Sequence, residues 1–351
     1  MEIVERIEAF VRARLHSVDD FERLALEAFA YQFERLAPYR ELCSRAGRTP
    51  STVETWAEIP AIPAAAFAEF ELATAPPREV FRSSGTTGTR RSVHHHPFPG
   101  LYRATVDAAL PLFCPLAAAR PPILALVAPR DVVADSSLGF MAAHVLERFG
   151  GVGSDYAFGA RGVELGKARS WLGARQRESR PAMIFATAFA LADLVDFLAR
   201  MKLHFRLPAG SVIFETGGFK GRTKEIPRQE LIARAGTWLG VPPSGILSEY
   251  GMTELTSQCY TRALAGDASG RFAPPAWVRV RALAPDTLAE LPEGETGLLA
   301  IFDLANVGSA LHLLTKDLGA IESREFRLAG RAADADLRGC SLAVEEMSAG
   351  S

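Results

Sequence analysis

The chain has 351 residues, of which 48% are hydrophobic and 23% charged, and 39 Lys and Arg against 41 Asp and Glu leave a formal net charge of −2. These proportions are typical of a globular protein and exclude collagen-like, coiled-coil and intrinsically disordered chains. Phosphate neutralisation needs a surplus of clustered cations, so the near-zero charge argues against a general nucleic-acid binder. We expect a small-molecule site, in two domains or in one large α/β domain with an appendage.

The cysteines and the N-terminus indicate the compartment. The four cysteines, at positions 43, 114, 259 and 340, show no Cys-x-x-Cys spacing and fit free thiols in a reducing environment. The first six residues are acidic and amphipathic, unlike a signal peptide. Apolar runs are far shorter than the roughly 20 residues that span a bilayer. We expect a cytoplasmic protein with no membrane partner.

The predicted elements alternate along the chain. Apolar residues spaced by three and four from Phe21 to Tyr31 predict a helix, and prolines at 60, 63, 76 and 77 interrupt the helical pattern. Short apolar runs then alternate with longer helical patterns. The predicted strands are 123–127, 183–185, 212–214, 298–302 and 311–314, and the predicted helices are 138–149 and 189–201. This alternation predicts an α/β fold with a largely parallel sheet, whose ligands bind at the carboxyl ends of strands.

A segment rich in Ser, Gly and Thr, Ser83-Ser84-Gly85-Thr86-Thr87-Gly88-Thr89-Arg90-Arg91, is a candidate polyphosphate-binding loop. Glycines let backbone N–H groups point to one place, hydroxyls add donors, and the two arginines add charge. No Walker A pattern occurs in the chain. Composition alone fits an ordinary turn equally well.

Further candidate segments follow apolar runs. Ser248-Glu249-Tyr250-Gly251-Met252-Thr253-Glu254 offers an aromatic ring, a hydroxyl and carboxylates, which suit a base, a phosphate and Mg²⁺, although a core tyrosine beside solvated glutamates has the same composition. Glu215-Thr216-Gly217-Gly218-Phe219-Lys220 lets a flat ligand approach the backbone. Asp317 is placed to accept hydrogen bonds from ribose hydroxyls.

Two more features carry reactive side chains. Cys340 stands beside Arg338-Gly339 near the end of the chain, and a neighbouring cation favours the nucleophilic thiolate, although a buried inert cysteine is the usual alternative. His94-His95-His96 has the composition of a metal tract, but three consecutive side chains cannot all face one ion.

The order of these segments, Ser-Ser-Gly-Thr-Thr-Gly, Gly-Gly, Tyr-Gly-Met-Thr-Glu, Thr-x-Asp and Gly-Arg, resembles the motif series of the adenylate-forming superfamily, which activates carboxylic acids with ATP. More narrowly, Ile59-Pro60-Ala61-Ile62-Pro63, Ser136-Ser137-Leu138-Gly139-Phe140-Met141, Gly217-Gly218-Phe219-Lys220 and Arg338-Gly339-Cys340-Ser341-Leu342 resemble LuxE-type acyl-protein synthetases. The similarity runs from about residue 31 to residue 342.

The resemblance implies an α/β fold like the N-terminal domain of adenylate-forming enzymes, with mixed or parallel sheets. It implies a helical segment at 1–80 that packs on the main domain, an adenylate-binding domain at 81–330, and a short C-terminal stub at 331–351. Only 20 residues follow Arg331, so the lysine that larger members carry in a C-terminal domain is missing, and Lys220 or Lys316 is a candidate substitute.

The resemblance also implies roles for single residues. The nucleotide would meet Ser83, Ser84, Gly85, Thr86, Thr87 and Gly88 at its phosphates, Gly217, Gly218, Tyr250 and Gly251 at adenine, and Asp317 and Arg331 at ribose or phosphate. Thr253 would bind the α-phosphate and Glu254 would ligate Mg²⁺. The remaining expected catalytic residues are Lys220 and Cys340. Cys340 would accept the acyl group.

The function that this resemblance implies is that of an AMP-forming acid–thiol ligase. It would use ATP and Mg²⁺ to convert a fatty or aromatic acid into acyl-AMP and pass the acyl group to a cysteine or to the thiol of an acyl-carrier or reductase protein. An acyl-CoA ligase or CoA-to-carrier acyltransferase, with CoA as acceptor, and a nucleotide-binding scaffold without turnover remain alternatives. We expect the acid pocket between about residues 130 and 220, made apolar by Phe140, Met141, Phe158, Phe185 and Phe189. The resemblance also favours one of His94, His95 and His96 as a lining residue of this pocket over a metal ligand.

Overall fold

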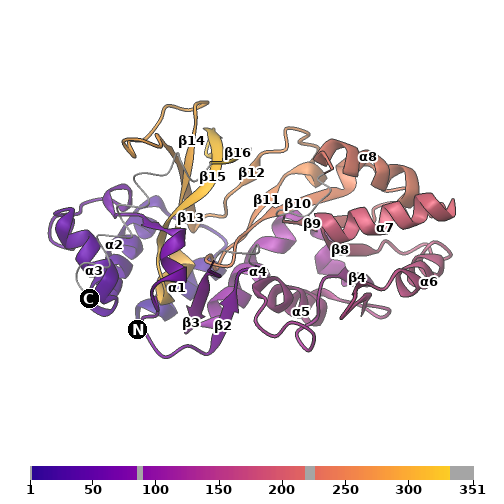
Figure 1. The fold of residues 1–351 in the computed structure, drawn as a ribbon, viewed down its shortest axis with the longest axis horizontal. Helices are drawn as coiled ribbons and strands as arrows, with labels where there is room; N and C mark the ends of the chain where they lie inside the picture. Colours follow the sequence, from indigo (N-terminus) through magenta and orange to yellow (C-terminus); the bar gives the residue numbers. More distant parts are fainter. Residues whose placement is uncertain (1, 85–89, 218–225, 333–351) are drawn as a thin grey trace. The chain divides into compact units, whose positions relative to one another are not determined.

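The computed structural model describes residues 2–84, 90–217 and 226–332 and divides into two compact units (Figure 1). Unit 1 comprises the described residues of Met1–Thr105, Met252–Gln258 and Arg271–Ser351. Unit 2 comprises those of Val106–Gly251 and Cys259–Gly270. The chain therefore passes from unit 2 to unit 1 inside the Tyr-Gly-Met-Thr-Glu motif, between Gly251 and Met252.

Unit 2 contains a mostly parallel sheet with the strand order β11-β10-β9-β8-β4-β5. Its strands are β4 (Ile123–Leu126), β5 (Asp155–Tyr156), β8 (Met183–Thr187), β9 (Val212–Thr216), β10 (Ile246–Tyr250) and β11 (Cys259–Thr261). Only β11 runs antiparallel to its neighbour β10. Two short strands, β6 (Phe158–Gly159) and β7 (Gly162–Val163), form a separate hairpin. The carboxyl ends of β8, β9 and β10 therefore lie at one edge.

The helices of unit 2 are α5 (Ser137–Phe149), α6 (Leu165–Arg175), α7 (Ala188–Met201) and α8 (Arg228–Leu239), and α4 (Pro99–Phe113) ends in this unit. Side-chain caps start two of them: Ser136 Oγ accepts from the Gly139 N–H at 3.0 Å, and Thr187 Oγ1 accepts from the Ala190 N–H at 3.1 Å. Helices α6, α7 and α8 bury an aliphatic face against the sheet, and α7 and α8 lie side by side in Figure 1.

Unit 1 contains an antiparallel sheet with the order β13-β14-β15-β16-β12. Its strands are β12 (Phe272–Ala273), β13 (Val278–Leu283), β14 (Thr296–Asp303), β15 (His312–Glu322) and β16 (Glu325–Arg331), with β1 (Ile62–Pro63) parallel to β15. A separate antiparallel hairpin joins β2 (Glu79–Arg82) to β3 (Val93–His96). Short 3₁₀ helices connect several elements, among them η6 (Leu304–Gly308) after β14.

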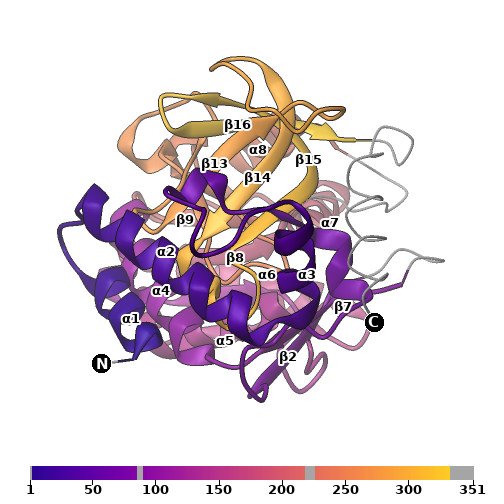
Figure 2. The same ribbon diagram turned by 90° about the vertical axis from the view of Figure 1, so that its left-hand side faces the viewer.

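Three helices near the N-terminus cover strands of unit 1: α1 (Ile3–Arg12), α2 (Val18–Arg35) and α3 (Ala37–Arg45) (Figure 2). Ser17 caps α2 by accepting from the Asp20 N–H. The Phe21 ring of α2 packs edge-on against Phe302 of β14, with ring centroids 5.8 Å apart. The Arg279 guanidinium of β13 lies over the Phe21 ring, 3.9 Å from its centroid. Aromatic contacts thus fix α2 to the sheet.

The predicted elements are confirmed in type and order. The helix predicted from Phe21 to Tyr31 lies within α2, and the predicted strands correspond to β4, β8, β9, β14 and β15. The largest difference is β15, predicted as 311–314 but running from His312 to Glu322, because pairing with both β14 and β16 keeps its polar residues in the ladder. The domain boundaries at 80 and 330 stay predictions. None of the helices in the described part of the chain combines the length and apolar character needed to cross a membrane.

Candidate functional site

The predicted phosphate loop connects strands β2 and β3 of unit 1 in the sequence. The Ser83 N–H donates to the Ser92 carbonyl, and the Ser83 hydroxyl accepts from the Ser92 N–H, each at 3.0 Å. Ser84 follows as the last described residue before the loop. Gly85, Thr86, Thr87 and Gly88 lie outside the described residues. Ser83 therefore has a defined structural role, which is to close the hairpin beneath the loop.

The two arginines after the loop have protein partners. Arg90 Nη1 lies 2.7 Å from Glu69 Oε2, with both side chains well exposed. Arg91 donates from Nε to the Ser83 carbonyl and from Nη2 to the Arg82 carbonyl, the latter at 3.4 Å. Exposed ion pairs contribute only about 0–1 kcal/mol, so the Arg90–Glu69 pair adds little to stability.

Thr253 and Glu254 lie in a short turn of unit 1 whose two carbonyl groups are held by side chains from elsewhere in that unit. His94 Nδ1 of β3 lies 2.8 Å from the Thr253 carbonyl oxygen, and Asn306 Nδ2 of η6 donates to the Glu254 carbonyl at 2.9 Å. The Glu254 residue is only 6% exposed. The backbone that would present a phosphate-binding hydroxyl and a metal-binding carboxylate is thus fixed by buried hydrogen bonds.

Asp303, the last residue of β14, anchors the two residues that complete this turn. Its Oδ2 accepts from the N–H groups of Thr256 at 3.0 Å and Ser257 at 2.7 Å. Its Oδ1 accepts from the Ser257 hydroxyl at 2.6 Å and from the Ala305 N–H at 3.1 Å. Burial raises the pKa of Asp303, and these hydrogen bonds act against that rise. Asp303 therefore satisfies four donors in a fully buried setting.

Asp317 and Arg331 are brought together on adjacent strands. They face each other in the register of β15 and β16, and Arg331 Nε lies 2.9 Å from Asp317 Oδ1. The Asp317 side chain is 18% exposed, whereas that of Arg331 is 65% exposed. The Asp317 N–H donates to Thr315 Oγ1 at 3.1 Å. The two residues expected at the ribose thus form a pair that the sequence did not predict.

In unit 2, the predicted adenine residues lie at the carboxyl ends of β9 and β10. Gly217 follows β9 with φ +68°, a conformation that favours glycine. Tyr250 ends β10 and is 8% exposed. A Cβ on Gly251 would lie 2.3 Å from Glu249 Oε1, so this position accepts only glycine without a shift of that side chain. Thr216 Oγ1 donates a hydrogen bond to the Glu249 carboxylate.

A second buried carboxylate lies on the other face of these strands. The Ser248 hydroxyl donates to Glu215 Oε2 at 2.8 Å, and Arg228 Nε lies 4.0 Å from the same oxygen. Burial raises the pKa of Glu215, while Ser248 and Arg228 oppose the rise. Glu215 and Glu249 are therefore both buried and hydrogen-bonded, so the alternative of a solvated glutamate beside Tyr250 does not hold for Glu249.

Three further expected site residues cannot be placed. Gly218, Lys220 and Cys340 lie outside the described residues. The other three cysteines, Cys43, Cys114 and Cys259, are buried free thiols. Burial raises the pKa to about 12 for Cys43 and to about 11 for Cys114, so neither is a ready thiolate near neutral pH.

Sequence reasoning missed the residues that hold the Thr253–Glu254 turn. Asp303 and Asn306 directly follow a predicted strand in Asp-Leu-Ala-Asn, and polar residues at a strand end were the available signal. For His94 and His96 the sequence suggested a metal ligand or a lining residue of the acid pocket. In strand β3 they lie on one buried face and His95 on the other, as the two-residue period of a strand requires.

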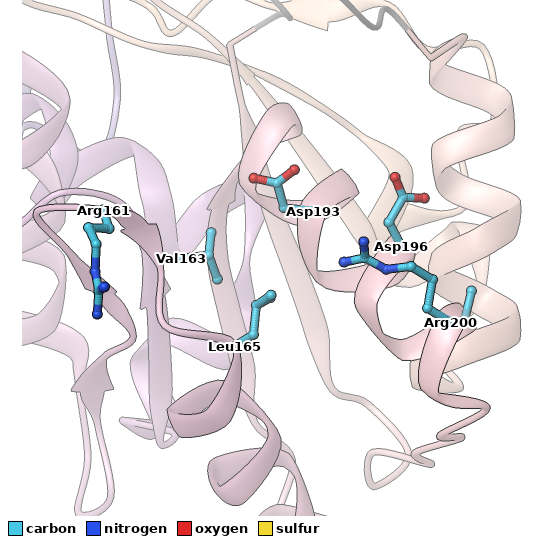
Figure 3. A pocket seen from close by; sticks show the side chains of 7 residues that line it. Arg161, Val163, Leu165, Asp193, Asp196 and Arg200 are labelled. Carbon is cyan, nitrogen blue, oxygen red and sulfur yellow. The ribbon is translucent and has the colours of Figure 1, made fainter.

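A surface groove of about 560 Å³ lies in unit 2 (Figure 3). Its lining comes from the β6–β7 hairpin, the start of α6 and the outer face of α7: Arg161, Val163, Leu165, Asp193, Asp196, Ala199 and Arg200. None of the five residues expected to line the acid pocket contributes to it. Phe185 instead stacks on Phe214, with ring centroids 4.5 Å apart.

The residues present fit a magnesium nucleotide better than a protein-only metal site. No group of three or more His, Cys, Asp or Glu side chains within residues 2–84, 90–217 and 226–332 could hold a metal ion. Mg²⁺ is commonly held by one or two carboxylates together with phosphate oxygens. A single carboxylate on a fixed backbone, as at Glu254, matches that donor set.

Residues 169–348 match the family model described as "Acyl-protein synthetase, LuxE". Over 87 residues the chain is 30% identical to the long-chain-fatty-acid–luciferin-component ligase of Vibrio harveyi, and that stretch spans only 23% of either protein.

The fold is similar to that of 2-hydroxyisobutyryl-CoA ligase in an open conformation, in complex with 2-HIB-AMP and CoA. The TM-score is 0.65 and the identity 15%, over 90% of this chain and 76% of that one. Apo MatB from Rhodopseudomonas palustris gives a TM-score of 0.50 and 16% identity, over 73% of this chain and 48% of that one. These structural similarities show that the chain has the α/β fold of these proteins. Because the LuxE model matches just over half of the residues, the chain belongs to the LuxE family of acyl-protein synthetases.

Proposed function

We propose that this protein activates a fatty or aromatic carboxylic acid with ATP, as acyl-AMP, and transfers the acyl group to a thiol. The observation that carries the proposal is the Thr253–Glu254 turn of this LuxE family member. The turn would supply a hydroxyl and a carboxylate, and its backbone is held by His94 and Asn306. Reactions at phosphorus depend mostly on such positioning and on electrostatic stabilisation.

Several residues would bind the nucleotide. Gly217 and Gly251 would leave room for adenine beside Tyr250, and Asp317 would accept hydrogen bonds from the ribose hydroxyls. The 65% exposed Arg331 side chain can reach a phosphate or the ribose while its partner Asp317 stays anchored through its own N–H. Arginine suits this role because its guanidinium presents several donors in a fixed plane.

In the first step, a carboxylate oxygen of the acid attacks the α-phosphorus of ATP. A bond forms between that oxygen and phosphorus, and the bond to pyrophosphate breaks. The Thr253 hydroxyl would donate to an α-phosphate oxygen as charge develops there. Bound Mg²⁺, held by Glu254 and phosphate oxygens, would neutralise charge on the phosphates.

In the second step, a thiolate attacks the acyl carbonyl carbon and AMP leaves with the bonding pair. We propose Cys340 as this thiolate. The support is the resemblance to LuxE-type synthetases, in which Cys340 is the position that matches the acyl-accepting cysteine. The other three cysteines, Cys43, Cys114 and Cys259, are only 0%, 0% and 2% exposed. From Cys340 the acyl group would pass to a carrier or reductase protein.

The test is acid-dependent exchange of labelled pyrophosphate into ATP, run with a panel of aliphatic and aromatic acids. We expect exchange with at least one acid, lost in Thr253→Val and Glu254→Gln and retained in Glu290→Gln, an exposed matched control on the same unit. Cys340→Ser should retain exchange and lose the covalent acyl label. Absence of exchange with every acid would refute the proposal.

A CoA ligase is the second candidate, because 2-hydroxyisobutyryl-CoA ligase, which shares the fold, is seen with CoA bound. Adding CoA to the exchange reaction separates the two candidates. An acyl-CoA product formed equally by the native protein and Cys340→Ser would favour the CoA ligase, and a labelled protein without acyl-CoA would favour the synthetase.

A further inference from the structure

The hairpin that carries the predicted phosphate loop is tied to the Thr253–Glu254 turn by a histidine. His94 lies two residues after Ser92, which closes the hairpin by bonding to Ser83. Its ring is fully buried, and its Nδ1 lies 2.8 Å from the Thr253 carbonyl oxygen. One side chain therefore connects the two backbone segments expected to meet the nucleotide phosphates.

The Thr253 carbonyl determines which nitrogen of the His94 ring carries the proton. A carbonyl oxygen can only accept, so His94 must carry its proton on Nδ1. Its Nε2 has no hydrogen-bond partner among the described residues and is buried. Burial lowers the pKa of His94 to about 4, so the ring is neutral near pH 7 and remains in this one tautomer.

A second chain of hydrogen bonds ends on the neighbouring carbonyl and is equally determined. Asn306 Nδ2 donates to the carbonyls of Glu254 at 2.9 Å and Ala310 at 2.7 Å, which orients its Oδ1 toward Thr256. The Thr256 hydroxyl donates to that Oδ1 at 2.7 Å, so it must accept from His96 Nε2 at 3.0 Å. Each N–H and O–H in this series of hydrogen bonds therefore has one acceptor.

Asn306 is itself anchored from the N-terminal helices. Gln32 of α2 is fully buried, and its Nε2 donates to the carbonyls of Asn306 and Val307, each at 3.1 Å. Its Oε1 accepts from the Leu311 N–H at 3.1 Å. The amide that holds the Glu254 carbonyl therefore cannot rotate freely, because its own backbone is held as well.

We propose that His94 is a positioning residue for adenylation: its Nδ1–H holds the Thr253–Glu254 turn in place relative to the β2–β3 hairpin. The inference rests on the proposed function for its kinetic consequence. A displacement of about 1 Å in positioning groups can cost about 100-fold in rate. Losing the bond should therefore lower kcat for adenylation and leave the KM for the acid unchanged.

The kinetic test compares three substitutions. His94→Leu removes the donor, His94→Asn keeps an N–H at the position of Nδ1, and His95→Leu makes the same change on the opposite face of β3. We expect kcat for pyrophosphate exchange to fall at least about tenfold in His94→Leu. His94→Asn and His95→Leu should both stay close to the native protein. Equal losses in His94→Leu and His94→Asn, or no loss in His94→Leu, would overturn the proposal.

A second measurement separates this proposal from the failure of the proposed function. Amide hydrogen exchange of residues 252–258, measured by mass spectrometry, requires no catalytic activity. Exchange there should accelerate in His94→Leu and stay native in His94→Asn and His95→Leu. If the native protein exchanges no pyrophosphate with any acid, the proposed function fails, while this measurement still decides whether His94 positions the turn. Native exchange at 252–258 in His94→Leu would overturn the positioning role.

Discussion

The two units have centres of opposite chemical character. The buried cluster of unit 2 consists of aliphatic and aromatic side chains, such as Leu194, Val195 and Ile213, packed between helices and a parallel sheet. The centre of unit 1 around residues 252–258 includes two histidines, Asp303 and Asn306, all fully or almost fully buried. Apolar cores tolerate changes of shape that conserve volume, whereas a polar network requires each partner in place. Unit 1 thus gains a uniquely fixed backbone where the proposed chemistry needs one.

The largest expected effect of this difference is a dependence of the free energy of unfolding on pH. Burial lowers the pKa to about 4 for His94 and about 3 for His312, and well below the usual value for His96. The unfolded chain binds protons at these histidines below about pH 6.5, while the folded chain leaves them neutral. Stability is therefore complete above about pH 6.5 and falls by about 1.4 kcal/mol per pH unit for each histidine as the pH decreases. Raised pKa values of Asp303 and Glu215 partly offset this loss.

Urea midpoints at pH 7.5, 6.5 and 5.5 measure this dependence. The double variant with His94→Asn and His312→Asn keeps donors near both Nδ1 positions and lacks these titrations, so it should lose much of the pH dependence. Equal midpoints for the native protein at all three pH values would contradict the prediction.

The next largest effect is expected from Asp303→Ala. The substitution leaves three N–H groups and the Ser257 hydroxyl without their acceptor in a buried site, at a cost of about 4 kcal/mol in the free energy of unfolding. Asp286→Ala, at an exposed position, should change it by less than about 0.5 kcal/mol. Denaturant unfolding of both variants gives the comparison, and similar values for the two would disprove it.

A pair of substitutions with little change in volume sharpens the contrast between the units. Asn306→Leu in unit 1 removes the donor to two carbonyls and the acceptor for the Thr256 O–H, and it should cost about 3 kcal/mol. Leu194→Met in unit 2 keeps the core apolar and should cost less than about 1.5 kcal/mol. Thermal and urea unfolding check both. The comparison between units breaks down if Leu194→Met proves the more damaging change.

The smallest effect on stability is expected from Arg331→Ala. Its ion pair with Asp317 has a largely exposed guanidinium, so the free energy of unfolding should change by less than about 0.5 kcal/mol. Loss of a charged donor to the nucleotide should raise the KM for ATP about fivefold, or about 1 kcal/mol. Arg327→Ala, on the same strand and paired with Glu322, is the control and should leave the KM unchanged. An unchanged KM in Arg331→Ala would remove Arg331 from the proposed site.

Sequence patterns predicted β4, β8, β9, α5 and α7 of unit 2 because these elements follow local rules, whereas α6 and α8 begin without a side-chain cap and were not predicted. The helix starts carry capping residues at Ser136 and Thr187, and the strands are continuous apolar runs, as in a sheet covered by helices. Much of unit 1 escaped prediction for the opposite reason. Its strand β15 passes through Lys316 and Asp317, and only pairing with two neighbours makes that polar stretch a strand.

The order of motifs in the sequence determined the family, the fold class and the expected nucleotide residues, because glycines, hydroxyls and carboxylates are chemically recognisable where they stand. Tertiary structure alone decided which distant side chains hold them. His94 is 159 residues from Thr253, and Asn306 is 52 residues from Glu254, so no local pattern encodes either contact. Their imidazole and amide are buried because the chain brings carbonyls to meet them, and a buried polar group is stable only with such a partner.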